Sequence, residues 1–348
     1  MHIHITKMNK LFLLLLMAPF SSATAQDATY HLPKTAIETT VFIEKSVYTP
    51  GDLALYSQRF LKKSAGQEKT EQYRILSIDM APVPVPDTTK VFTAHIDQKH
   101  NIQRLALSDD NILLAVNAEP AQRTGTVPFA PAPRPRPLDP YKYLSQEILS
   151  VGSKIKMAEL CAKEIYDIRE SRNELTRGQA DYMPKDGEQL RIMLQNLETQ
   201  ETAIRQMFEG VTVTDTLVAT VRYIPEGDVK DEPLFRFSRH YGLLASDDLA
   251  GDPYLITVDD LHSMPERINE AGKKQKDETG IWVVLPGKVR VTLTDGKNSV
   301  LKSVEFSASQ YGDVENLNEP LFSKKVMTRL NLNPYNGGIE KIESEPLK

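Results

Sequence analysis

The sequence predicts an α+β protein: antiparallel β-rich N-terminal and C-terminal units, sandwich-like, with a long helical hairpin inserted between them. Short apolar segments with a period of two fill residues 26–118 and 211–348. Over residues 141–210 the apolar positions instead recur every three or four residues, which is typical of helices. Prolines crowd residues 127–140 and favour an extended chain, so residues 119–140 are predicted to be a Pro-rich linker.

Residues 1–25 are typical of a cleaved signal peptide. Two lysines precede an apolar run over residues 11–20, and Ala23 and Ala25 then supply the A-x-A pattern of a signal peptidase site. The apolar run is far shorter than the ~20 residues that span a bilayer. We therefore expect export to the periplasm or cell surface, cleavage near Ala25-Gln26, and no transmembrane segment in the mature chain.

Composition narrows the classes of partner. Asp and Glu number 47 against 42 Lys and Arg, which gives a formal charge of −5 and argues against nucleic acid as the main partner. Cys161 is the single cysteine, so the chain forms no intramolecular disulfide. Because Cys161 falls inside a predicted helix with no neighbouring histidine, we expect a small apolar filler there and not a nucleophile.

The N-terminal unit is predicted to contain strands and one short helix. Alternation over Thr35–Ser46 indicates a strand, and Thr49 followed by Pro50 is typical of a helix start. The "APVPVP" segment at 81–86 lacks backbone donors at alternate positions, which places it on a sheet edge or in a loop. Further strands are predicted over residues 73–78, 91–96, 102–107 and 112–116, with a turn at Ser108–Asn111 between the last two.

The central region is predicted to form two paired helices. The first runs from Lys142 to Arg177, with Gly152 as its weak point, and the second runs from Gly187 to Glu209. At 1.5 Å per residue the second helix is ~35 Å long, which lets the two pair side by side.

Charges crowd the stretch "RESRNELTRG" and the loop after it. Gly178 is a natural helix stop, and Asp186 is a suitable N-cap for the returning helix. We therefore interpret this stretch as the tip of a hairpin and not as an active site. If it functions, the predicted contact surface consists of Arg169, Arg172, Asn173, Glu174, Arg177 and Tyr182.

The C-terminal unit is predicted to be antiparallel β. Its turn signals are Asp295-Gly296, Asn336-Gly337 and Pro286-Gly287. Strands are predicted over residues 212–224, 234–238, 254–258, 280–285, 288–294, 300–307, 325–332 and 339–342. Whether the two β regions share one sheet system stays open.

The segment that most resembles a metal-binding site is "VDDLHSMPERI" at 258–268. His262 and Glu266 would share a helix face if the helix began early enough, but Ser263 and Glu266 form a capping box that leaves His262 outside it. "SDDLAGD" at 246–252 lacks the ligand register of a calcium loop. No phosphate-binding, nucleophile-elbow or zinc-helix motif occurs. We therefore predict no cofactor and no metal, and the catalytic residues of an enzyme, if it is one, stay unknown.

Several segments together carry a resemblance to a family. They include "YTPGDLALYSQRFL", "KMAELCAKEIYDIRESRNELTRGQADYMPKDGEQL", "FRFSRHYGLLASDDLAGDPYLI", "WVVLPGKVRVTL" and "QYGDVENLNEPLF". In this order the segments resemble an uncharacterised family of exported proteins of Bacteroides-type bacteria, a domain of unknown function. The resemblance implies export and one architecture over nearly all of the mature chain, and it supplies no catalytic residues.

Two functions from different classes are compatible with these observations. The first is a non-enzymatic envelope or surface protein that acts in assembly or in recognition of envelope proteins or glycans. It predicts an exposed aromatic or apolar patch on the hairpin or on a β face. The alternative is a hydrolase of glycan or peptide, which predicts a cleft with two converging carboxylates or with a histidine and a carboxylate.

Overall fold

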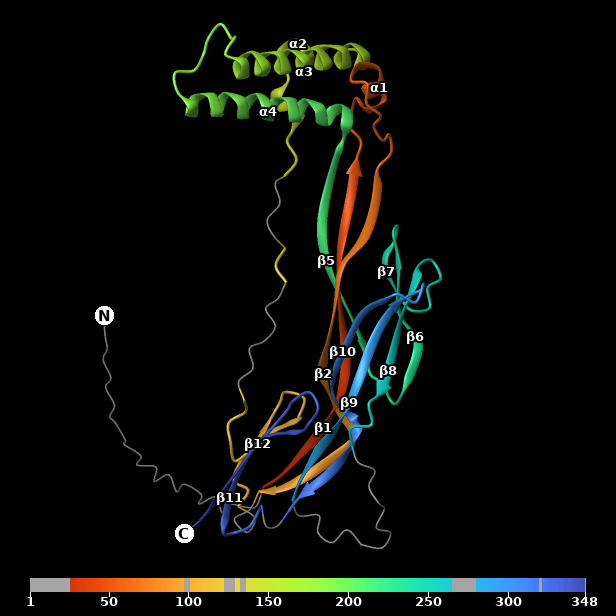
Figure 1. Cartoon of the computed structure of the whole chain (residues 1–348), viewed down its shortest axis with the longest axis vertical. Coiled ribbons are helices and arrows are strands. Elements are labelled where there is room, and N and C mark those ends of the chain that lie inside the picture. The colour runs from red at the N-terminus through yellow and green to blue at the C-terminus, as the bar shows by residue number, and fades with distance from the viewer. Residues whose placement is uncertain are drawn as a thin grey trace, which may run out of the picture.

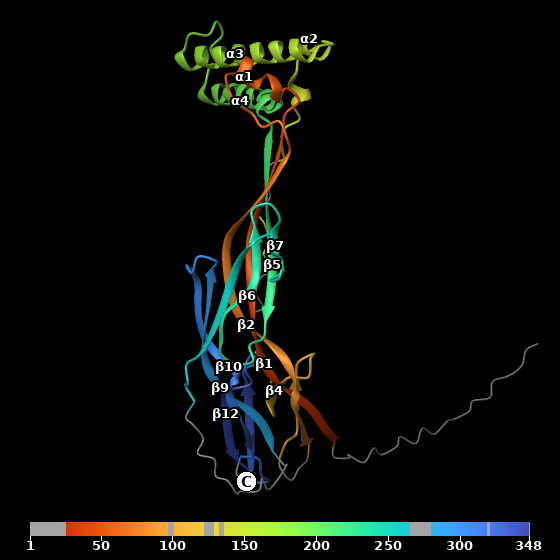
Figure 2. The same cartoon turned by 90° about the vertical axis from the view of Figure 1, so that its right-hand side faces the viewer.

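The structure is a computed structural model, and it is elongated. A helical head lies at one end, a narrow β stalk joins it, and a broader β body follows (Figures 1 and 2). Antiparallel sheets with a helical pair inserted in the chain confirm the predicted α+β class. The residues that the structure describes are 26–96, 101–121, 129–131, 136–264, 280–318 and 321–347.

A single strand, β1 (Gln26–Thr49), forms the axis of the molecule. Its 24 residues span about 80 Å at ~3.3 Å per residue. β1 is the middle strand of a three-stranded antiparallel sheet, between β2 (Thr70–Ile96) and β5 (Val211–Tyr223). Because β5 follows the helical hairpin in the chain, the two β-rich regions share this sheet.

β2 unites segments that the sequence predicted as separate strands. It runs without a break from the predicted 73–78 strand to the 91–96 strand and includes the "APVPVP" segment at 81–86. The sheet order places β2 at the edge, so the prediction of a sheet edge for these prolines is confirmed. Proline tolerates this position because its missing N–H costs no ladder bond on the open side.

The body contains a second, five-stranded sheet that packs against the first. Its strands, in sheet order, are β10 (Val300–Leu317), β9 (Ile281–Asp295), β8 (Asp252–Asp260), β6 (Val229–Ser238) and β7 (Gly242–Leu244). Side chains from both sheets interdigitate as in a sandwich. The buried residues of this core are Ile37, Val41, Ile43, Met80, Leu234, Phe235, Ile256, Val258, Val289, Val291, Leu293 and Ala308.

The base of the body contains a third sheet. Its strands, in order, are β12 (Ile339–Pro346), β11 (Val326–Leu332), β4 (Leu113–Val116) and β3 (Leu105–Leu107). β11 pairs with β4, so here too the N-terminal and C-terminal regions share a sheet. The buried residues of this second core are Tyr30, Leu32, Ala94, Ile102, Leu113, Val116, Ile281, Val283, Val284, Phe322, Leu330 and Leu332.

Three of the predicted turns are confirmed. Asn111 N–H donates to the Ser108 carbonyl at 3.0 Å, which closes the turn between β3 and β4. Asp295 N–H donates to the Ser299 carbonyl at 3.1 Å in the hairpin between β9 and β10. Gly337, between β11 and β12, has a φ of +68°, a value that suits glycine in a tight turn.

The predicted turn at Pro286-Gly287 is wrong, because both residues lie inside β9. On the neighbouring strand β10 the pairing is irregular between Ala308 and Asp313. The two backbones approach so closely there that a Cβ on Gly287 would lie 1.8 Å from the Tyr311 carbonyl oxygen. The glycine therefore serves a close backbone approach and not a chain reversal.

A buried polar cluster joins β1 to β10 at this irregularity. Thr35 is fully buried; its N–H donates to Gln310 Oε1 at 2.9 Å and its hydroxyl donates to the Tyr335 carbonyl at 2.9 Å. Gln310 Nε2 donates in return to the carbonyls of Thr35, at 2.9 Å, and Pro225, at 3.2 Å. Because these groups satisfy one another's hydrogen bonds, the cluster holds β10 against β1 and is not an open polar site.

The head consists of six helical segments. They are η1 (Ala54–Tyr56), α1 (Ser57–Phe60), η2 (Pro140–Tyr143), α2 (Gln146–Leu149), α3 (Lys154–Arg177) and α4 (Gly187–Glu209). Among the described helices, none is both long and apolar enough to cross a membrane. The buried residues of the head core are Leu53, Leu144, Ile148, Ala158, Cys161, Ala162, Ile165, Ile168, Ile204, Met207 and Phe208.

Two helix predictions need correction. The single helix predicted from Lys142 to Arg177 is wrong in its first part, because the chain leaves the helix over residues 150–153, around Gly152. The helix start at Thr49-Pro50 is also wrong, since β1 continues to Thr49 and η1 begins only at Ala54. The second long helix, α4, has the predicted bounds.

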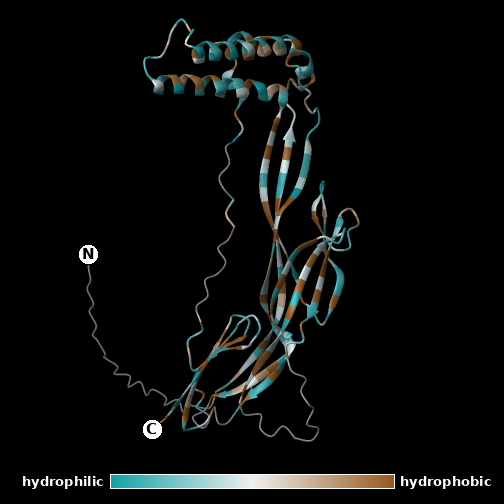
Figure 3. Ribbon diagram, viewed as in Figure 1, coloured by the Kyte–Doolittle hydropathy of each residue, from teal (hydrophilic) through white to brown (hydrophobic). Residues whose placement is uncertain are grey.

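The stalk is the part of the three-stranded sheet that extends beyond the body, residues 44–49, 70–72 and 211–216 (Figure 1). Apolar and polar residues alternate on β5 from Val211 to Thr214, whereas residues 44–46 and 70–72 are all polar (Figure 3). Lys45 Nζ lies 2.7 Å from Glu71 Oε1 across the β1–β2 pair, so an ion pair supplements the backbone ladder.

The Pro-rich segment also connects the base to the head. At its start, Asn331 Nδ2 donates to the Glu119 carbonyl at 3.0 Å. Midway, the Phe129 ring lies edge-on to Phe42 of β1, with centroids 5.2 Å apart. After its end, Tyr141 Oη donates to Asp52 Oδ2 at 2.5 Å. The described parts of this segment therefore contact the base, β1 and the head in turn.

Candidate functional site

A buried acid holds two of the predicted contact residues, Arg169 and Arg172. Glu201 on α4 accepts a hydrogen bond from Arg169 Nε at 2.8 Å and lies 3.0 Å from Arg172 Nη1. Arg205 Nη1 lies 3.9 Å from the same carboxylate. The side chain of Glu201 is 6% exposed, whereas the three arginines are 32–38% exposed. These charges clamp α3 onto α4.

Sequence reasoning missed Glu201, although a signal was present. Glu201 lies four residues after Leu197 and three before Ile204, in the middle of the stripe that α4 buries. An acid at a core position of a helix requires a cation near it; the sequence offers Arg205 one turn further along α4, and Arg169 and Arg172 on the other helix. The partner was hidden because it lies on the other helix.

The remaining predicted contact residues lie at the exposed end of the head. Asn173, Glu174 and Arg177 are exposed on the last turns of α3, and Tyr182 in the following loop is 66% exposed. The predicted helix stop at Gly178 is confirmed by its left-handed backbone, with a φ of +70°. Their use as a contact surface stays a prediction.

The loop that enters the second helix also follows the prediction. Asp186 is the N-cap of α4, and its Oδ1 accepts from Gln189 N–H at 2.8 Å. Gln189 Oε1 in turn accepts from Lys185 N–H at 3.3 Å, one residue earlier than in a standard capping box. The charges around this loop therefore cap a helix.

The segment at 258–268, which resembles a metal-binding site, shows no cluster of metal ligands in its described part, residues 258–264. His262 Nδ1 lies 3.3 Å from Asp260 Oδ2, and the His262 side chain is exposed. Ser263 Oγ accepts from Lys288 N–H at 2.7 Å. Glu266, and with it the proposed capping box, lies outside the described residues. Across the described ranges, no three His, Cys, Asp or Glu side chains come together as metal ligands do.

The aspartate-rich loop at 246–252 is held by an arginine. Arg236 Nε donates to the Ser246 carbonyl at 2.9 Å, and its Nη1 donates to the Gly251 carbonyl at 3.1 Å. Asp248 Oδ1 accepts from Ala250 N–H at 2.9 Å. A guanidinium therefore occupies the interior of the loop and satisfies carbonyls that a calcium ion would otherwise need.

Cys161 lies in the head core and is fully buried. Burial raises the pKa of its thiol to about 11. A thiol with such a pKa carries almost no thiolate at neutral pH, which suits a packing role and not a nucleophile.

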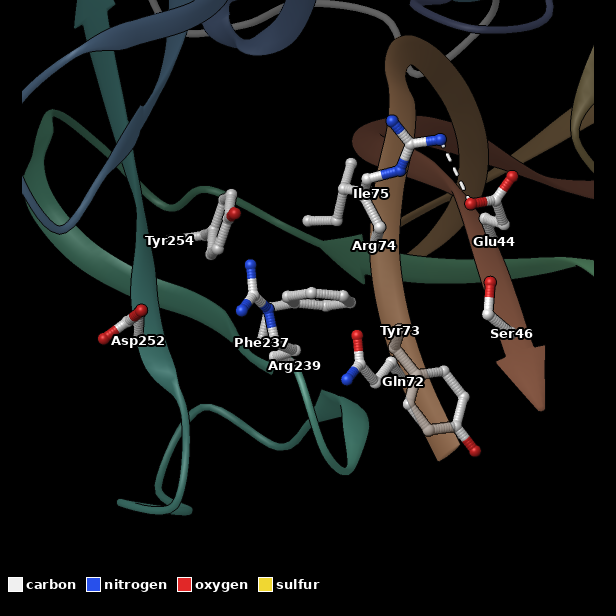
Figure 4. A pocket seen from close by; sticks show the side chains of 10 residues that line it. All are labelled: Glu44, Ser46, Gln72, Tyr73, Arg74, Ile75, Phe237, Arg239, Asp252 and Tyr254. Atoms are coloured by element: carbon white, nitrogen blue, oxygen red, sulfur yellow. Dashed lines mark hydrogen bonds and ion pairs between the residues drawn. The ribbon is translucent and has the colours of Figure 1, made fainter. Parts of the chain in front are cut away.

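A pocket of about 460 Å³ lies where the stalk meets the body, between β1 and β2 on one wall and β6 and β8 on the other (Figure 4). We call it the stalk-base pocket. Glu44 and Arg74 on the first wall are paired at 3.1 Å, and Asp252 lies on the opposite wall. The full lining is Glu44, Ser46, Gln72, Tyr73, Arg74, Ile75, Phe237, Arg239, Asp252 and Tyr254.

A second pocket, of about 310 Å³, lies under the head. Its lining is mostly apolar and combines the end of the Pro-rich segment, at Leu138 and Tyr141, with Met207 of α4 and Val213 of β5. Asp52, which accepts the Tyr141 hydrogen bond, is the single acid of its lining. It is a junction between elements and lacks the paired acids that a hydrolase needs.

These features define a class: a stalked α+β protein whose helical head stands away from a β-sandwich body. The chain belongs to the family described as a domain of unknown function (DUF4831), which matches residues 26–340. No curated protein and no solved structure matches the chain.

Proposed function

We propose that this protein is exported to the cell envelope and acts there by binding, with the head as its contact surface in an assembly. The signal-like residues 1–25 support export. The family match begins at residue 26, directly after the expected cleavage site, which supports this proposal.

The separation of the head from the body carries the proposal. Three strands hold the head beyond the body, so the far end of the α3–α4 pair is accessible from several sides (Figures 1 and 2). Tyr182 and Met183 expose apolar surface in the loop at this end, and Ile192 does so on α4. These exposed aromatic and apolar side chains, together with the exposed Arg177, have the composition of a protein contact site.

The hydrolase alternative requires two carboxylates, or a histidine and a carboxylate, that converge in a cleft. No histidine lines the pockets of about 460 and 310 Å³. In the stalk-base pocket, Glu44 and Asp252 lie on opposite walls, and Glu44 is neutralised by Arg74 (Figure 4). Glu201, the most buried acid of the head, is clamped by arginines. No observation in the described part of the chain favours catalysis over binding.

The experiment is proximity labelling in the native envelope with a labelling enzyme fused to the full chain, followed by pull-down. The head variant Tyr182→Ala is compared with Tyr241→Ala, because Tyr241 is equally exposed, at 69% against 66%, but lies in the turn between β6 and β7. We expect the head variant to lose a reproducible protein partner that the control retains. Equal capture by the two variants, or labelling of no partner, would refute the head as the contact surface.

A further inference from the structure

The stalk-base pocket has a balanced charge. The wall from β1 and β2 carries Glu44 and Arg74, and the wall from β6 and β8 carries Asp252 and Arg239. Because each wall carries one charge of each sign, the lining has no net charge that would attract an ion of either sign. The pocket therefore favours a neutral ligand.

The same pocket offers polar groups without a partner. Within the described residues, the side chains of Ser46, Gln72, Arg239 and Asp252 make no hydrogen bond and no ion pair. Arg239 can only donate, Asp252 in its ionised form can only accept, and Ser46 and Gln72 can do both. A matching ligand must therefore carry several groups that donate and accept at once, as hydroxyls do.

An aromatic platform stands beside these polar groups. The Tyr254 ring is stacked on Phe235, with centroids 4.7 Å apart and an interplanar angle of 14°. Phe237 meets the Tyr254 ring edge-on at 6.5 Å. Because Tyr254 is fixed from two sides, it presents a rigid apolar surface to a ligand at low entropic cost.

The two walls are also tied to each other. Tyr73 N–H donates to the Arg239 carbonyl at 2.7 Å, which joins β2 to the turn after β6. Gly242, the first residue of β7 directly after that turn, lies against the Tyr73 ring, where a Cβ would come within 3.2 Å of it. The pocket is therefore pre-formed, because its walls cannot separate without the loss of these contacts.

We propose that the stalk-base pocket binds a neutral saccharide unit, with the sugar's C–H face on Tyr254 and Phe237 and its hydroxyls on Arg239, Gln72 and Asp252. A sugar combines an apolar face with hydroxyls that both donate and accept, and the volume of about 460 Å³ is within the range of small-ligand sites. This site is separate from the head and goes beyond the proposed function.

The test is affinity electrophoresis of the full mature chain in gels that contain starch, dextran, xylan or mannan, with polygalacturonate as the charged comparison. Any neutral polysaccharide that retards the protein is then followed by calorimetry with its oligosaccharides. The variants are Arg239→Ala and Asp252→Asn. The control is Arg177→Ala, which also removes the positive charge of an exposed arginine, but on the head.

We expect at least one neutral polysaccharide to retard the wild type. Loss of a hydrogen bond to a charged group should weaken binding about tenfold or more in both pocket variants and leave the Arg177→Ala control unchanged. Retardation by polygalacturonate alone, retardation by no neutral polysaccharide, or equal binding by Arg239→Ala would overturn the proposal. Tyr182→Ala should bind saccharide like the wild type, so the head and the pocket can fail independently.

Discussion

Glu201 allows the most direct test of how the head is held together. Its carboxylate joins Arg169 and Arg172 of α3 to α4 at 2.8 and 3.0 Å. Glu201→Ala leaves these two guanidiniums facing each other without an acid, whereas Arg205 keeps Glu209 at 2.7 Å. The change therefore removes a partner and also introduces repulsion between like charges.

The expected loss follows from the burial of the pair. Breaking a fully buried ion pair costs about 3–5 kcal/mol. The arginines here are about one third exposed and can turn partly toward water, so we expect about 2–3 kcal/mol for Glu201→Ala. Glu201→Gln keeps the shape and some of the hydrogen bonds and should cost about half as much.

The assay is urea unfolding of the chain from residue 26 onward, followed by circular dichroism in the helical band, because the two longest described helices lie in the head. The control Glu188→Gln removes an acid that is paired with Arg191 at 2.6 Å on the exposed surface and should leave the midpoint unchanged. A loss below about 0.5 kcal/mol for Glu201→Ala would refute the clamp. Replacing both Arg169 and Arg172 by leucine in the Glu201→Ala background should restore part of the stability.

Two further predictions concern the body and the head core. Gly287→Ala places a Cβ 1.8 Å from the Tyr311 carbonyl oxygen and should lower the free energy of unfolding by about 3 kcal/mol or more, measured by thermal unfolding. The control is Gly227→Ala, because no atom lies within 4 Å of the added Cβ. Equal effects of the two substitutions would contradict the close approach at Gly287. Cys161 should resist iodoacetamide in the folded protein and react on unfolding. Because burial raises its pKa to about 11, its contribution to stability should be complete below the unfolded-state pKa near 9 and should fall as the pH rises from there to about 11. Rapid alkylation of the folded protein would contradict this account.

Local chemistry explains which predictions from the sequence succeeded. Three correct predictions depend only on residues within a few positions of each other, so the local sequence is enough to make them. They are the left-handed glycine at Gly178, the N-cap at Asp186 and the Asp295-Gly296 turn. The bounds of α4 follow in the same way from its cap and its apolar stripe.

The misses arise from contacts between distant segments. Pro286-Gly287 is a dipeptide typical of turns, but both residues lie in β9, where the backbone of β10 approaches closely. The pairing of β1 with β5 could not be predicted from the alternation of apolar and polar residues. Such alternation indicates which face of a strand is buried, but not which strand pairs with it. The stalk-base pocket was missed for the same reason, because its two walls come from segments more than 150 residues apart.

The long axial strand β1 has a consequence for the order in which the chain can fold. β1 contributes residues to both cores of the body and adjoins the head core, yet it is among the first segments synthesised. Its partner β5 begins more than 150 residues later, and β9, β10 and β11, which complete the two body cores, come later still. Pairings of such high sequence separation form slowly, because the chain must close long loops before any contact is gained. The N-terminal region therefore stays incomplete until nearly the whole chain is available, and its folding is expected to follow synthesis of the chain and not to accompany it.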